Sequence, residues 1–173
     1  GISIATQYRF ITTCSNSSIA DTSNIVSKGL NNYLNCYCIP TGGGSTTYGI
    51  NNVSTTNGLT NISNLNSGTT ASGYTDYSGA QVLTTTINAI IGIAASGVGS
   101  STYGWAIWVD WNKNGSFADA GEKMYNSTSY LNAIPANTTF TVPALDGNSN
   151  PVDTGLRKMR IIGHYLNSNP QND

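Results

Sequence analysis

Charged side chains are scarce in this chain. Only 9% of its 173 residues are charged, the formal net charge is -1, and there is a single histidine. The seven Lys and Arg residues are scattered apart from Arg157, Lys158 and Arg160. The sequence therefore has no basic stripe of the kind that binds nucleic-acid phosphates, and we expect no nucleic-acid partner.

Long hydrophobic runs and helix-forming stretches are also missing. The most apolar run, residues 89–95, is far shorter than the roughly 20 residues that span a bilayer, so we expect no membrane insertion. Stretches rich in Ala, Leu, Glu and Lys are rare, whereas β-branched residues and turn formers dominate. This composition is typical of secreted or cell-surface β proteins, and it predicts an all-β fold.

The chain does contain a run of oxygen-bearing side chains at alternate positions. These are Asp110, Asn112, Asn114 and Ser116, and Gly115 stands where a sharp turn would need a positive φ. Alternate residues of a tight loop converge on one point, and Ca²⁺ binds about six to eight such oxygens. We therefore predict a calcium loop with these four ligands, closed by Asp119 or Glu122. The alternative is an ordinary Asn-Gly turn with a solvated acidic face.

The residues before this loop favour a strand. Trp105, Ile107, Val109 and Trp111 alternate with other residues at a period of two, which predicts that they share one face and point into the core. A helix-loop-helix calcium sensor is not expected, because Gly121 occupies the position where such a loop places its closing Glu.

No pattern of catalytic residues is evident. The sequence has one His, few acids and no G-x-S-x-G motif, and the three carboxylates of the predicted loop are too crowded for a glycosidase pair. We therefore expect a protein that is not an enzyme.

The three cysteines are an odd number for a secreted domain. Cys36 and Cys38 would make a strained pair with each other, so we predict a disulfide from Cys14 to one of them. The remaining thiol is free and buried, joins an intermolecular disulfide, or binds zinc with His164.

The chain divides into an arm and a main body. Residues 1–35 form the arm, in which Ile2, Ile4, Tyr8 and Phe10 alternate like a strand before a Ser/Asn-rich run. In residues 36–173, short apolar runs alternate with turn signals and predict an antiparallel β-sandwich. These runs cover residues 50–53, 59–65, 82–86, 87–94, 103–111, 139–142 and 156–166.

From Cys38 onward the sequence resembles the GEVED domain family. The resemblance depends on residues 37–41, 48–53, 73–78, 109–122 and 157–161, of which the tryptophan-containing loop at 109–122 is the most specific. It implies a β-sandwich module of secreted and cell-surface proteins of Bacteroidetes and their relatives. The acidic motif that names the family, and the last strand that follows it, should come after Tyr165, yet the sequence given stops at Asp173.

Two functions fit these observations. The first is an extracellular structural or adhesive module, in which the arm inserts as a donor strand into a sandwich that lacks its last strand. Insertion into a neighbouring copy builds a filament, whereas insertion into the same chain gives a monomer. The anchors would be Ile2, Ile4, Tyr8 and Phe10, and the partners would be copies of the chain or other domains of a surface protein.

The alternative is a carbohydrate-binding module, with an outward-facing Trp108 as the platform for a polysaccharide. Burial of Trp108 beneath the arm is the other interpretation of that residue.

Overall fold

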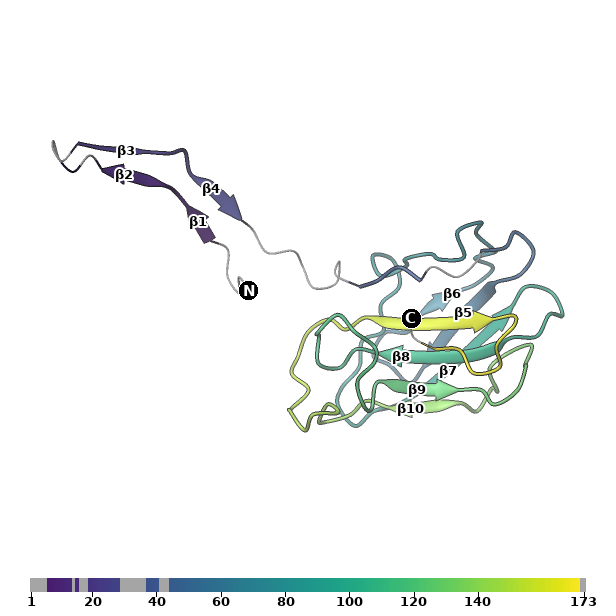
Figure 1. Cartoon of the computed structure of the whole chain (residues 1–173). Helices are drawn as coiled ribbons and strands as arrows, with labels where there is room; N and C mark the ends of the chain where they lie inside the picture. Colours follow the sequence, from purple (N-terminus) through teal and green to yellow (C-terminus); the bar gives the residue numbers. More distant parts are fainter. Residues whose placement is uncertain (1–5, 14, 16–18, 29–36, 41–43, 172–173) are drawn as a thin grey trace. The chain divides into compact units, whose positions relative to one another are not determined.

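The computed structural model describes residues 6–13, 15, 19–28, 37–40 and 44–171. The chain divides into two compact units, Gly1–Cys36 and Tyr37–Asp173, which are considered separately (Figure 1). Within the described ranges the chain is all-β, as its composition predicts, and its sheets are antiparallel. None of these residues forms a helix long and apolar enough to cross a membrane.

The first unit is a two-stranded ribbon. Strand β1 (Thr6–Tyr8) pairs with β4 (Val26–Lys28), and β2 (Ile11–Thr13) pairs with β3 (Ala20–Thr22). Between the two pairs, the backbone N–H of Ser23 donates to the carbonyl of Phe10, and the N–H of Phe10 donates to the Ser23 hydroxyl. The arm was predicted as one strand followed by irregular chain, and this is wrong because the polar run returns as the second half of a hairpin.

The second unit is a sandwich of two antiparallel sheets. Three strands form one sheet in the order β11-β8-β9, with β8 (Gly104–Val109) between β11 (Met159–His164) and β9 (Lys123–Asn126). Four strands form the other in the order β10-β7-β5-β6 (Figure 1). Their bounds are β10 (Thr139–Thr141), β7 (Ile90–Gly97), β5 (Ile50–Thr56) and β6 (Ser63–Asn64).

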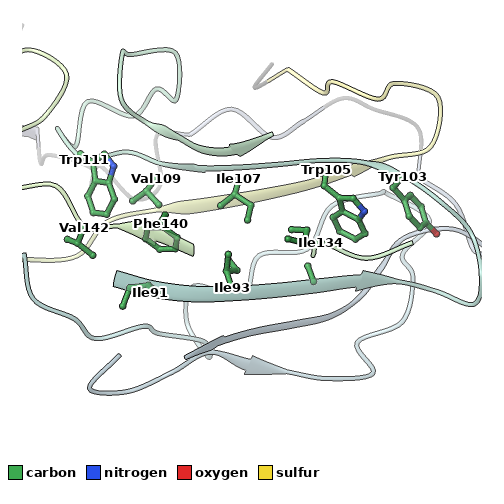
Figure 2. Packing of buried hydrophobic residues seen from close by; sticks show 11 residues of the cluster. Ile91, Ile93, Tyr103, Trp105, Ile107, Val109, Trp111, Ile134, Phe140 and Val142 are labelled. Carbon is green, nitrogen blue, oxygen red and sulfur yellow. The ribbon is translucent and has the colours of Figure 1, made fainter. Parts of the chain in front are cut away.

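The core lies between β7 of one sheet and β8 of the other (Figure 2). Trp105, Ile107 and Val109 extend from β8 towards Ile91 and Ile93 of β7, and all five are buried. Successive side chains of a strand point to opposite faces, so the period-two pattern places these β8 residues on one side. The predicted core face of residues 105–111 is thus confirmed, because Trp111 continues the same cluster.

Strand β8 is buried on its outer face as well. Ala106 and Trp108 pack there with Phe117, which comes from the loop after β8, and Tyr37 and Ile162 contact the same cluster. This second cluster fastens the predicted metal loop to the sheet from which it emerges.

The strand boundaries differ in places from the predicted ones. Strands form in six of the seven apolar runs, whereas residues 82–86 contribute only an isolated bridge from Thr84 to Thr60. Strand β9 was missed because its sequence, Lys-Met-Tyr-Asn, shows little alternation of apolar and polar residues.

Candidate metal loop

The predicted metal loop connects β8 to β9. It begins at Asp110, directly after the last residue of β8, and ends at Glu122, directly before β9. Phe117 holds its middle against the outer face of β8, where its ring lies 5.1 Å from that of Tyr37. The loop is therefore fixed at both ends and in its middle.

Asp110 organises the first turn of the loop and is completely buried. Its Oδ1 accepts a hydrogen bond from the backbone N–H of Lys113 at 2.6 Å. Its Oδ2 accepts one from the N–H of Gly115 at 2.9 Å and one from the hydroxyl of Tyr37. Lys113 and Gly115 both have positive φ values, 61° and 84°, which bend the chain back around the carboxylate. A carboxylate has about four acceptor positions, so one remains for a further partner.

The side-chain oxygens of the next residues in the loop accept hydrogen bonds from backbone N–H groups two positions further along. The side-chain oxygen of Asn112 accepts from the N–H of Asn114 at 3.0 Å, and that of Asn114 accepts from the N–H of Ser116 at 2.8 Å. The amide nitrogens of both asparagines donate to Oδ2 of Asp119, at 3.1 and 2.6 Å. The loop thus brings Asn112, Asn114 and Asp119 together through the amide nitrogens of the two asparagines, and the predicted calcium ligation by their oxygens remains a prediction.

Glu122 is the unusual residue of the loop, because its carboxylate is 1% exposed. Oε1 accepts a hydrogen bond from the backbone N–H of Trp111 at 3.2 Å. Oε2 is buried and has no hydrogen-bond partner among the described residues. An unsatisfied buried carboxylate oxygen costs on the order of several kcal/mol unless a proton or a cation neutralises it.

The electrostatics of the loop favour a cation. Burial raises the pKa of Glu122 to about 7, and repulsion by Asp110 and Asp119 adds to the effect. The nearby basic side chains do not offset this charge, because Lys113 and Arg157 both form ion pairs with Asp153, at 2.7 and 2.5 Å.

The acidic side chains of the loop are not enough by themselves to form a metal site. Within the described ranges, no three Asp, Glu, His or Cys side chains form a group that could hold a metal. A calcium ion would therefore also need the amide oxygens of Asn112 and Asn114 and the hydroxyl of Ser116, which are ligands that calcium accepts. The donor set of hard oxygens and the unpartnered Oε2 of Glu122 fit that ion.

The sequence did not reveal the residues that support the loop from elsewhere in the chain. Tyr37 binds Asp110 from 73 positions away, and the guanidinium of Arg157 donates to the backbone carbonyl of Trp111 at 2.8 Å. Both residues lie in segments that resemble the GEVED family, and this resemblance was the one feature of the sequence that could have linked them to the loop.

The structure corrects the expectation for Trp108. Its side chain is 2% exposed, between Ala106 and Phe117, and the ammonium of Lys123 lies 5.2 Å from the ring centroid. Although alternation correctly places Trp108 on the outer face of β8, the metal loop covers that face. The ring is therefore not available as a platform for a polysaccharide.

The other predicted residues are only partly described. Cys38 is free and exposed, which does not match the buried free thiol expected from the sequence. Cys14 and Cys36 lie outside the described residues, so a disulfide from Cys14 remains a prediction. His164 is exposed, and its Nδ1 accepts a hydrogen bond from the N–H of Leu166. Among the donor-strand residues, Ile2 and Ile4 also lie outside the described residues, whereas Tyr8 and Phe10 are 50% and 72% exposed.

A comparison with models of known protein families supports the resemblance to the GEVED domain over part of the chain. The model of the GEVED domain matches residues 104–173, which run from the first residue of β8 through the metal loop and β11. This part of the chain is therefore similar to the GEVED domain. The match begins further along the chain than the resemblance read from the sequence, so residues 37–78 lie outside it. No curated protein and no solved structure matches the chain.

Proposed function

We propose that this chain is a non-catalytic structural module of a secreted or cell-surface protein, stabilised by one calcium ion in the loop from Asp110 to Glu122. The observation that carries the proposal is the carboxylate of Glu122. It is buried, it is repelled by two other carboxylates, and one of its oxygens has no partner among the described residues.

The calcium ion would act on stability. The loop links β8 to β9 and packs on the outer face of β8, so a cation that offsets the repulsion among its three carboxylates would stabilise the sandwich. Asp110, Asn112, Asn114, Ser116 and either Asp119 or Glu122 would hold the ion, and buried Glu122 is the better candidate to close the site.

Thermal unfolding with and without a chelator tests this role. After verified metal removal, we expect the melting temperature to fall, and restoring calcium at about 100 times its Kd should add roughly 2.7 kcal/mol to the free energy of unfolding. Asp110→Ala should remove the response to calcium. A melting temperature that is the same in calcium and in chelator would contradict the proposal.

The arm would supply the adhesive part of this function. Its ribbon exposes Tyr8, Phe10, Ile11, Ile25 and Val26 by 50% or more, and a two-stranded ribbon is at best marginally stable by itself. We therefore propose that the arm adds to the edge of a sheet in a second copy of the chain, which would propagate into a filament. The donor would be a hairpin, because β1 already pairs with β4.

Electron microscopy and size-exclusion chromatography of the intact chain, compared with a variant lacking residues 1–13, test the assembly. The intact chain should form filaments or large oligomers and the shortened chain should be monomeric. Compact, monodisperse monomers from the intact chain would end the filament proposal and leave the calcium proposal standing.

A further inference from the structure

A polar hollow lies between the metal loop and a second loop of similar composition. It has a volume of about 410 Å³ and is lined by Trp111, Asn112, Asn114, Asp146, Asn148 and Asn150, together with Lys113, Pro151 and Asp153. This volume falls within the range of about 300 to 1,000 Å³ typical of small-ligand sites.

The second loop repeats the spacing of the first. Asp146, Asn148 and Asn150 stand at alternate positions, and Oδ1 of Asp146 accepts hydrogen bonds from the backbone N–H groups of Asn148 and Asn150, at 2.9 and 2.8 Å. The carboxylate of Asp146 is therefore largely used within its own loop. The side-chain amide of Asn148 makes no hydrogen bond with the described residues, and Asn148 lines the hollow.

The two loops are fixed against each other by close backbone contact. A Cβ added to Gly147 would lie 1.8 Å from the carbonyl oxygen of Ala120, so only glycine allows this approach. On the other side, Lys113 of the first loop pairs with Asp153, which follows the second. These contacts hold the walls of the hollow in place.

The lining indicates the chemistry of the ligand. The side-chain amide of Asn148 has an oxygen that accepts and a nitrogen that donates, and the side-chain oxygen of Asn150 adds an acceptor, which suits hydroxyl groups that do both. The nitrogen of Asn150 donates to Asp146 at 3.3 Å, and the side-chain amides of Asn112 and Asn114 are bonded within the metal loop. The charges are close to balanced, because Asp153 is paired with Lys113 and with Arg157. A strongly anionic ligand would find no unpaired cation among the lining residues described here, and an apolar ligand would bury polar groups without partners.

We propose that this hollow binds a neutral, polyhydroxylated ligand, namely one or two sugar units of a polysaccharide, with Asn148 and Asn150 as its principal hydrogen-bonding residues. The inference goes beyond the structural role, although the hollow shares Asn112 and Asn114 with the proposed calcium site. It also places sugar binding at a different part of the molecule from Trp108.

Isothermal titration with oligosaccharides of glucan, mannan and galactan, each at millimolar concentration, tests the proposal. At least one series should bind, and Asn148→Ala and Asn150→Ala should each weaken that binding tenfold or more while leaving the melting temperature unchanged. Asn137→Ala is the matched control, because Asn137 is an exposed turn asparagine outside the hollow, and it should bind as the unaltered chain does.

Two results would overturn the inference. One is the absence of binding by all three series, and the other is binding that both Asn148→Ala and Asn150→Ala leave intact. The sugar proposal is tested by binding affinity, and the calcium proposal is tested by thermal stability. A negative result for one can therefore be distinguished from a negative result for the other.

Discussion

The backbone N–H of Trp111 donates a hydrogen bond to the buried carboxylate of Glu122 at 3.2 Å, and this contact joins the first and last turns of the metal loop. The backbone carbonyl of the same Trp111 accepts from Arg157, and its ring lies in the core between the two sheets. The geometry of the loop is thereby linked directly to the packing of the sandwich.

The core between β7 and β8 should carry most of the stability of the sandwich. Ile107 is fully buried, so we expect Ile107→Ala to lower the free energy of unfolding by about 2 to 5 kcal/mol through lost burial and the cavity left behind. Ile87→Ala is the control, because Ile87 is 53% exposed and its change should stay within about 0.5 kcal/mol. Urea unfolding measures both, and equal effects would contradict the assigned core.

The contact between the two loops should tolerate no side chain at residue 147. Gly147→Ala would force a methyl group into the carbonyl oxygen of Ala120, and we expect a loss of about 1 to 3 kcal/mol as the loops separate. Gly79→Ala has open space around the new Cβ and should be neutral or slightly stabilising. A Gly147→Ala variant as stable as Gly79→Ala would show that the loops do not touch.

The ion pair between Asp76 and Lys158 should make a small, pH-dependent contribution to stability. The hydrogen bond from Lys158, with others from Ser78, lowers the pKa of Asp76 to about 2 from 3.8. Because this pKa is depressed in the folded state, the contribution is present above about pH 3.8 and is lost as the pH falls through 2.

Asp76→Asn measures this contribution. The carboxylate is 48% exposed, so we expect the variant to lose less than about 1 kcal/mol near pH 6. The difference from the unaltered chain should shrink below pH 3.8, and combining the change with Lys158→Ala should remove it. A difference that is constant between pH 6 and pH 2 would rule out the ion pair as its cause.

The cysteines should form one disulfide, from Cys14 to Cys36 or Cys38. Closing a loop of this length should add about 3 kcal/mol by restricting the unfolded chain. Peptide mapping without reductant would identify the bridge, and a reducing agent should lower the melting temperature. Three free thiols would remove both this prediction and its support for an oxidising compartment.

The sequence predicted those features that depend on local periodicity. The alternation at residues 105–111 placed Trp105, Ile107 and Val109 on the core face, and this holds because strand geometry repeats every two residues. The spacing of Asp110, Asn112 and Asn114 predicted a calcium loop, and the calcium remains a prediction.

Contacts between residues far apart in the sequence could not be predicted from local periodicity. Alternation correctly placed Trp108 on the outer face of β8, but its burial depends on Phe117 folding back and on Tyr37, far away in the sequence. The second half of the arm hairpin was missed for a related reason, since the pairing of Val26 with Tyr8 leaves little trace in a polar sequence. The position of the hollow likewise depends on Gly147 meeting Ala120.

Glu122→Gln, measured by thermal unfolding at pH 8 with calcium and with chelator, tests the central claim most directly. The substitution keeps the shape of the side chain and removes its charge. Without calcium it should raise stability, on the order of 2 kcal/mol, because no charge is then buried and the repulsion from Asp110 and Asp119 disappears. With calcium it should lower stability, because the ion loses a charged ligand. A substitution whose effect has the same sign and size in both conditions would contradict a calcium ion at Glu122.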